Sequence, residues 1–124
     1  MTIRKFTVPI VTDGAGAATA YTPTFSGKIE QIRYIKTDFA NGVNFTSTLD
    51  GTGQTVWTQT AVNASAIVNP RVPTHTTAGV ASLYAAAGTG VNDKINVSRD
   101  RIKFVIDTGG ATKSGAMEVI VSDA

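Results

Sequence analysis

Branching at the β-carbon is the feature that most constrains how this chain can fold. The sequence holds 13 Val, 10 Ile and 19 Thr but only 2 Leu. Side chains branched at Cβ are stiff at χ1 and pack well on a pleated sheet, whereas Leu favours helices. The 12 Gly suit frequent tight turns. An all-helical protein is therefore excluded, and an all-β fold is predicted.

Length and composition narrow the class further. The 124 residues suffice for one domain with one core, and a 42% hydrophobic content with only 16% charged residues excludes a disordered chain. No apolar run approaches the roughly 20 residues that span a bilayer, so no membrane partner is expected. A formal charge of +2 without a clustered basic face predicts no specific nucleic-acid partner. The absence of Cys excludes disulfides and thiolate metal sites.

Turn signals at short intervals predict a single-domain antiparallel β-sandwich over 1–124, jelly-roll-like or Ig-like, with about eight strands. Alternating apolar residues indicate that 54–60 returns beside 43–49 in a hairpin, and that 115–122 returns beside 101–107 in another, joined by 108–114. The predicted strands are Ile3–Val11, 27–36, 43–49, 54–60, 94–98, 101–107 and 115–122.

Three features of this prediction are less regular. In 27–36, Ile32 and Tyr34 are expected to face one layer, with Ile29 and Ile35 facing the other. The small residues of 12–23 predict a loop, and prolines in the polar stretch 61–77 break any ladder there. The Ala-rich stretch 78–88 could hold a helical turn.

Candidate catalytic residues are few. His75, the single histidine, lies in a Thr-rich loop, and base catalysis needs an oriented partner, so a histidine hydrogen-bonded within its loop is the favoured interpretation. Asp13 and Asp50 stand in Asp-Gly turns that offer one carboxylate each, fewer than a calcium loop requires. No phosphate-binding loop or nucleophile elbow occurs. We therefore predict a chain that is not an enzyme and that takes no cofactor or metal.

Candidate interface residues come from three places. Trp57, the single tryptophan, can be a core aromatic, an interface anchor or a platform for a sugar ring. Arg99, Arg101 and Lys103 lie at spacing two, so on one strand they would share a face. That face is either merely solvated or a patch for an acidic partner.

The N-terminal strand offers the third candidate. Pro9 cannot donate to a ladder, which predicts that Ile3–Val11 lies at an edge or carries a bulge. Residues 1–5 could form a loose arm that a partner orders, with Arg4 and Lys5 supplying charge contacts. The alternative is that this strand simply pairs within its own sheet.

Whole-chain similarity adds a biological setting. The runs GKIEQIRYIKTDFANGVNFTSTLDGTGQTVWTQTAVNASA, PRVPTHTTAG and DRIKFVIDTGGATKSGAMEVIVSDA resemble small β-sandwich virion structural proteins of tailed bacteriophages, over about residue 10 to the C-terminus. The resemblance implies a capsid decoration or cement subunit that binds the outer surface of the major capsid protein shell. It carries no functional residue to a position in this chain.

The expected function is therefore structural. We expect a homo-oligomeric decoration protein on the virion surface, made in the cytoplasm of the bacterial host, with the major capsid protein as partner. The alternatives are a head–tail or tail structural protein of the same virion, or a carbohydrate-binding domain that attaches to host glycans.

Overall fold

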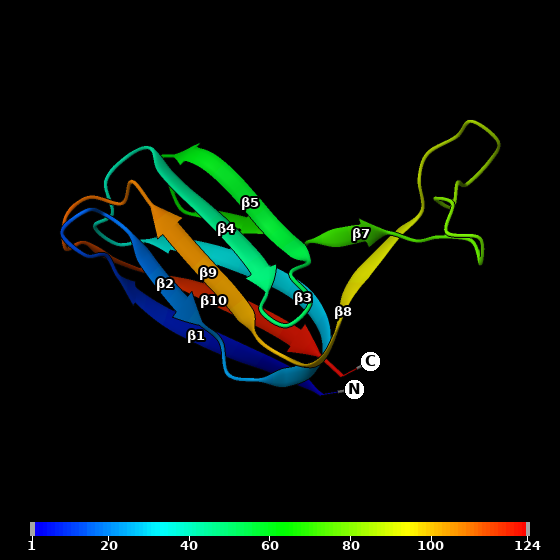
Figure 1. Ribbon diagram of the computed structural model, residues 1–124, viewed down its shortest axis with the longest axis horizontal. Coiled ribbons are helices and arrows are strands. Elements are labelled where there is room, and N and C mark those ends of the chain that lie inside the picture. Colours follow the sequence, from blue (N-terminus) through cyan, green and yellow to red (C-terminus); the bar gives the residue numbers. More distant parts are fainter. Residues whose placement is uncertain (1, 124) are drawn as a thin grey trace.

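The computed structural model describes residues 2–123, which form two antiparallel β-sheets packed face to face (Figure 1). The predicted β-sandwich is confirmed, with ten strands where about eight were expected. The strands are β1 (Ile3–Val11), β2 (Ala18–Tyr21), β3 (Phe25–Lys36), β4 (Val43–Leu49), β5 (Thr55–Val62), β6 (Ala66–Val68), β7 (Arg71–Pro73), β8 (Asn92–Asp100), β9 (Ile102–Asp107) and β10 (Ser114–Ser122).

The two layers have different strand orders. Sheet A runs β1-β10-β3-β8-β7, with the short β6 also paired to β3. Sheet B runs β2-β9-β4-β5. The predicted hairpin of 43–49 with 54–60 is confirmed as β4 and β5, and β1 lies at an edge of sheet A as Pro9 indicated.

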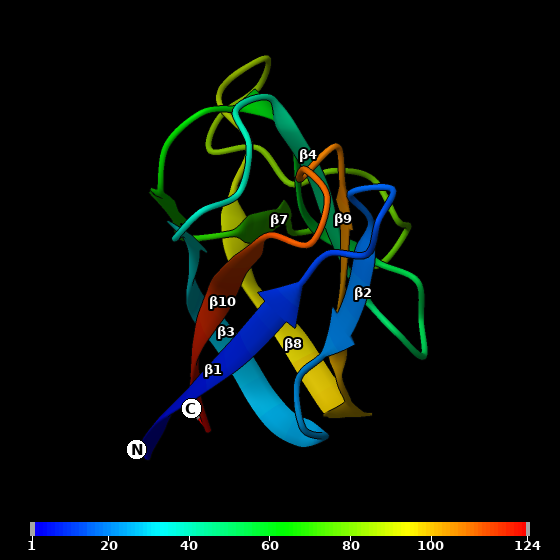
Figure 2. The same ribbon diagram turned by 90° about the vertical axis from the view of Figure 1, so that its left-hand side faces the viewer.

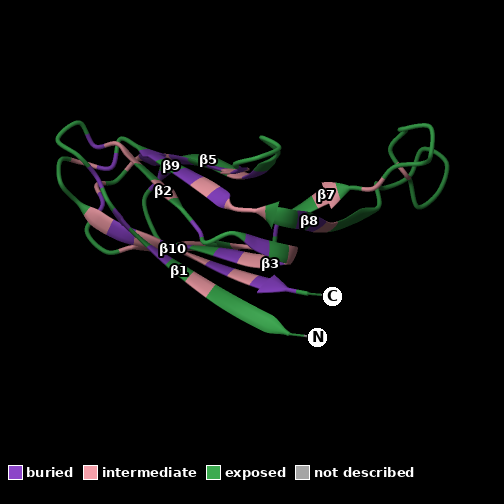
Figure 3. Cartoon of the chain, turned by 60° about the horizontal axis from the view of Figure 1, so that its bottom comes forward, coloured by how far each residue is buried: buried purple, intermediate pink, exposed green. Residues whose placement is uncertain are grey.

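The core lies between the sheets, and Figure 3 shows buried residues alternating with more exposed ones along strands of both layers. Period-two burial is cleanest in β4, β9 and β10, because each of these strands is flanked by a neighbour on both sides and shows one face to the other sheet. The fully buried large side chains of the core include Tyr34, Phe45, Phe104, Ile29, Ile32, Ile95, Ile102, Ile106 and Met117.

Strand β3 departs from simple alternation. Ile29, Ile32 and Tyr34 are all buried, whereas Ile35 is half-buried and paired with Ala116. The expectation that Ile29 and Ile35 share a face is therefore wrong. A β-bulge is the reason: the register of β3 on β10 shifts between Ile120 and Val121, and an extra residue in one strand reverses the facing of everything beyond it.

Gly27 fits the other irregular point of β3. Its φ is +140°, and its pairing with β8 shifts register between Phe25 and Gly27. A Cβ at this position would overlap the carbonyl oxygen of Ser122 in β10. Only glycine therefore allows β3 to pass so close to β10 at this end of sheet A.

The predicted hairpin of 101–107 with 115–122 is wrong. β9 pairs with β2 and β4 in sheet B, whereas β10 pairs with β1 and β3 in sheet A. Figure 2 shows the two strands in opposite layers, so the 108–114 connection crosses from one sheet to the other. Alternation places a face of each strand in the core, but it does not say which sheet the strand joins.

Several short elements also differ from the prediction. β2 lies inside the stretch expected to be a loop, and β6 and β7 lie inside the stretch expected to be broken by prolines. β7 holds Pro73 because it is an edge strand, which leaves the missing donor on an unpaired side. Residues 78–88 contain turns and isolated bridges, and no helix occurs within 2–123.

The connection between β7 and β8 stands apart from the sandwich. Residues 74–91, which we call the projecting loop, extend beyond the end of both sheets (Figure 1). The first and last described residues, Thr2 and Asp123, lie elsewhere, next to the start of β1 and the end of β10. The loop is therefore free of the sheets on most of its surface.

Candidate functional site

The charged residues are distributed unevenly along the chain, and the folded chain therefore has one region that is poor in charge. The sequence has 11 basic and 9 acidic residues, yet Arg71 is the only one of these between Gly51 and Asn92. This third of the chain, with Arg71 as its single charged residue, forms β5, β6, β7 and the projecting loop. In Figure 1 these elements occupy one side of the sandwich and the extension beyond it.

The projecting loop has a defined backbone structure. At its base the amide of Thr74 donates to the carbonyl of Val91 at 2.8 Å. The amide of Ser82 donates to the carbonyl of Thr74 at 2.9 Å, and the amide of Val91 donates to the carbonyl of Ser82 at 3.0 Å. Bridges between His75 and Ala81 and between Leu83 and Gly90 extend this pattern. The loop is therefore a small three-part meander of extended segments.

The same loop holds no core of its own. Tyr84 is 89% exposed, Val80 62% and Leu83 48%. Large apolar side chains at this level of exposure, on a segment without charges, are the surface features that interface cores share. The projecting loop is accordingly the strongest candidate for contact with another molecule.

This candidate was missed in the sequence. Its residues show neither the period of a helix nor that of a strand, so they were divided between a polar loop and a possible helical turn. The available signal was the charge gap from Gly51 to Asn92, because long exposed segments of soluble domains normally carry charges.

The predicted N-terminal arm is paired within its own sheet. Ile3, Arg4 and Lys5 pair with residues 122, 121 and 120 of β10. The Arg4 guanidinium donates to the carbonyl of Ser26 at 3.0 Å, and the Lys5 ammonium lies 4.0 Å from the Glu118 carboxylate. The structure therefore has the alternative to a loose arm, a strand that pairs within its own sheet. Met1 lies outside the described residues.

Arg99, Arg101 and Lys103 do not share one strand face, which corrects that prediction. Arg99 is near the end of β8 with a φ of +47°, Arg101 lies between strands, and Lys103 belongs to β9 in the other sheet. The left-handed backbone at Arg99 breaks the period of two where the chain crosses between sheets.

Arg101 is held in place by its neighbours. Its Nε donates to the Asp50 carboxylate at 3.0 Å, and its guanidinium lies 3.9 Å from the centre of the Tyr21 ring. These contacts tie the junction between β8 and β9 to the β4–β5 turn and to β2. They are typical of a structural role, because the cation already has both an anionic and an aromatic partner.

Trp57 lies in β5 at the edge of sheet B. It is partly buried, and its ring meets the buried Phe45 ring at a centroid distance of 4.7 Å and an interplanar angle of 73°. This is a favourable edge-to-face arrangement. Trp57 therefore contributes to the core on one side and remains partly accessible on the other.

Residues that could carry chemistry are dispersed. His75 is exposed in the projecting loop, and its backbone is bridged to Ala81. Within residues 2–123 no group of three His, Asp or Glu side chains could hold a metal ion. In the same range no helix is long and apolar enough to cross a membrane.

The most connected polar cluster lies around Glu30 on sheet A. Lys94 Nζ and Ser122 Oγ each donate to Glu30 Oε1 at 2.6 Å. These hydrogen bonds, the one from Lys94 first, and the charges of Lys94 and Arg71 lower the pKa of the Glu30 carboxyl. The cluster joins β3, β8 and β10, so its partners satisfy one another within the fold.

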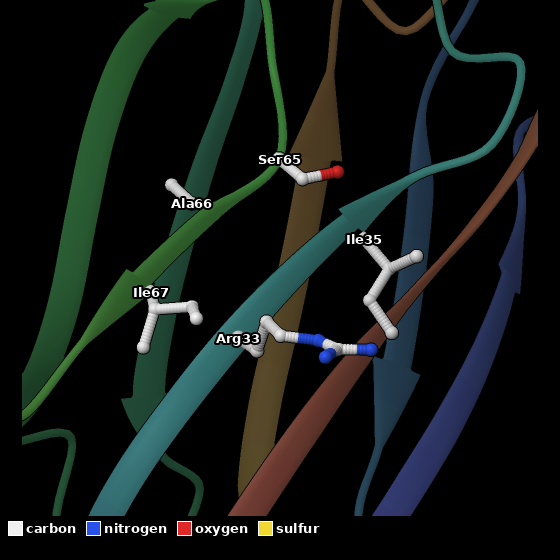
Figure 4. Close-up of a pocket in the computed structure, with 5 residues that line it drawn as sticks. All are labelled: Arg33, Ile35, Ser65, Ala66 and Ile67. Carbon is white, nitrogen blue, oxygen red and sulfur yellow. The ribbon is translucent and has the colours of Figure 1, made fainter.

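A surface hollow of about 410 Å³ lies where β6 runs beside β3 (Figure 4). Arg33 and Ile35 of β3 and Ala66 and Ile67 of β6 line it, with Ser65 at one end. It offers a single cation, one hydroxyl and aliphatic groups, which is too few convergent polar groups for a catalytic site.

Comparison with known proteins adds no assignment. No family model, no curated protein and no solved structure matches this chain.

Proposed function

We propose that this chain is a structural protein of a tailed-phage virion, which decorates the outer surface of the capsid shell and stabilises it. The observation that carries the proposal is the projecting loop, an ordered, uncharged segment that presents Val80, Leu83 and Tyr84 outside the sandwich. The resemblance of the sequence to small virion proteins supports the setting.

The proposed mode of attachment follows from the chemistry of the loop. Tyr84 is an amphipathic ring with few rotamers, and such residues often supply most of the energy of a contact. Because the loop lacks charged side chains, its insertion into a crevice between capsid subunits requires no desolvation of an ion. The sandwich then acts as the rigid body that holds the loop.

The test uses particles of the encoding phage that lack this protein. Purified chain is added back, and bound protein is measured by sedimentation of the particles. Leu83→Lys combined with Tyr84→Lys should abolish binding, because it places two cations in an apolar contact. Thr19→Lys on exposed β2 is the matched control and should bind normally. Bound wild-type chain should also raise the temperature at which particles rupture.

Other results would contradict the proposal. Binding that survives the double substitution would remove the loop from the contact. Binding confined to the neck or tail in electron micrographs would favour the head–tail alternative. Saturable binding to host glycans, without binding to particles, would favour the carbohydrate-binding alternative.

A further inference from the structure

We propose that the exposed edge of β5 is the interface between two copies of this chain, which pair β5 with β5 antiparallel across a two-fold axis at Thr58. The two four-stranded B sheets would then join into one continuous sheet. The proposal rests on the edge strands of the sandwich and is independent of the virion setting.

The edge strands of the two sheets differ in length and in charge. An edge strand presents unpaired backbone groups, and proteins normally protect it with charges, prolines or shortness. β1 carries Arg4, Lys5 and Pro9, and β7 is three residues long and carries Arg71 and Pro73. β2 and β6 have only four and three residues.

β5 differs from all of these. It has eight residues, TVWTQTAV, with neither a charge nor a proline. Within residues 2–123 its one ladder partner is β4, so its other side is open. Thr58, Gln59 and Thr60 on it are exposed. Of the longer edges, this is the one that lacks charge and proline.

The pairing with β4 indicates which part of β5 is available. Register shifts lie on either side of a regular stretch in which Trp57, Thr58 and Gln59 pair with Ser47, Thr46 and Phe45. Bulges bend a strand, so the regular stretch is the part that can accept another strand. A two-fold axis at its centre places Thr58 opposite Thr58 of the second copy and Trp57 opposite its Gln59.

The absence of charge on β5 favours a second copy of this chain as the partner of that edge. In an isologous contact each side chain meets its own kind or a near neighbour, so a charged strand would oppose like charges. β5 avoids this because it has no charge, whereas the other long edge strand, β1, carries the two cations Arg4 and Lys5. The pair would also cover the accessible part of Trp57.

The chain is well suited to a covalent test because it contains no Cys. Thr58→Cys places two thiols opposite each other, and Cα atoms of opposed residues in an antiparallel pair lie about 4.5–5.5 Å apart, within the range of a disulfide. Mild oxidation of the full-length variant should give a covalent dimer. Thr7→Cys, exposed on the edge strand β1, is the matched control and should not form the covalent cross-link.

The second measurement is sedimentation equilibrium over a concentration series. Wild-type chain should form a dimer, and the emission of Trp57 should move to shorter wavelength as the dimer forms. Thr58→Lys should abolish the dimer, whereas Thr19→Lys, exposed on β2 at the opposite edge of the same sheet, should leave it intact. Circular dichroism checks that both variants are folded.

The proposal is overturned by any of three results. A wild-type chain that is monomeric at every concentration contradicts it, as does a dimer that Thr58→Lys leaves unchanged. If Thr58→Lys fails to fold, the thiol variants decide: equal cross-linking of Thr58→Cys and Thr7→Cys removes β5 from the interface.

Discussion

The sandwich and the projecting loop both have regular backbone hydrogen bonds, but they differ in what lies behind those bonds. In the sandwich, side chains such as Ile32 and Phe104 are fully buried between two sheets. In the loop, bonds such as that from the Thr74 amide to the Val91 carbonyl have no buried side chains beneath them. Hydrogen bonds define the shape of both regions, whereas burial of apolar surface stabilises only the first.

The sandwich and the projecting loop also differ in their content of charged side chains. Ion pairs such as that between Lys94 and Glu30 join strands of the sandwich, at 2.6 Å between Nζ and Oε1. The loop has no formally charged side chain. The comparison therefore predicts that substitutions and acid affect the sandwich strongly and the loop weakly, and three experiments test this.

The largest effect is expected in the core. Phe104→Ala should lower the free energy of unfolding by about 3–5 kcal/mol, because it removes a fully buried ring and leaves a cavity between the sheets. Tyr84→Ala, which removes an aromatic side chain of similar size from the loop, should change it by less than about 0.5 kcal/mol. Urea denaturation measures both. Equal losses would mean that the loop is part of the cooperative core.

A smaller effect is expected from acid. Because hydrogen bonds lower the pKa of Glu30 in the folded chain, its ionised form stabilises the fold above the ordinary value of 4.5. That contribution is lost as the pH falls through the lowered value. Glu30→Gln should therefore be less stable than wild type at neutral pH, and the difference should narrow in acid.

Urea denaturation at several pH values measures this difference. Glu118→Gln is the matched control on the same sheet, since the Glu118 carboxylate is 3.9 Å from Arg33 and 4.0 Å from Lys5, beyond hydrogen-bond distance. It should destabilise less than Glu30→Gln. A difference for Glu30→Gln that widens in acid would show the wrong sign for this account.

The smallest effect is expected from shortening the loop. Replacing residues 76–89 by Asn-Gly leaves the closing contact between Thr74 and Val91 and removes no buried side chain. The free energy of unfolding should change by less than about 0.5 kcal/mol. Hydrogen exchange should agree, with loop amides exchanging much faster than those of β3 and β10. A truncated chain that fails to fold would refute the separation of the two regions.

The fold was predictable wherever alternation was regular. The residue types favoured an all-β fold, and the bounds of β1 and the existence of the β4–β5 hairpin followed from period two and turn signals. The partners of β9 and β10 were not predictable, because alternation fixes which face is buried but is silent about the sheet. The bulge in β3 and the short strands β2, β6 and β7 were missed because they depend on tertiary pairing.

The candidate site was predicted less well. Composition drew attention to the cations Arg99, Arg101 and Lys103, but the backbone turn at Arg99 separates them. For Trp57 the sequence left three roles open, as a core aromatic, an interface anchor or a platform for a sugar ring, and the structure places it partly in the core and partly at an open edge. The projecting loop was missed because exposure follows from where the sheets end, which local sequence does not reveal.

The closed base of the projecting loop has a practical consequence. The amide of Thr74 is hydrogen-bonded to the carbonyl of Val91, so the segment between these residues enters and leaves the sandwich at one point. A peptide of another sequence grafted there would meet the same anchor and leave the sheets undisturbed. We therefore expect the chain to serve as a display scaffold, whose tip can diversify by evolution or in the laboratory while the sandwich keeps its fold.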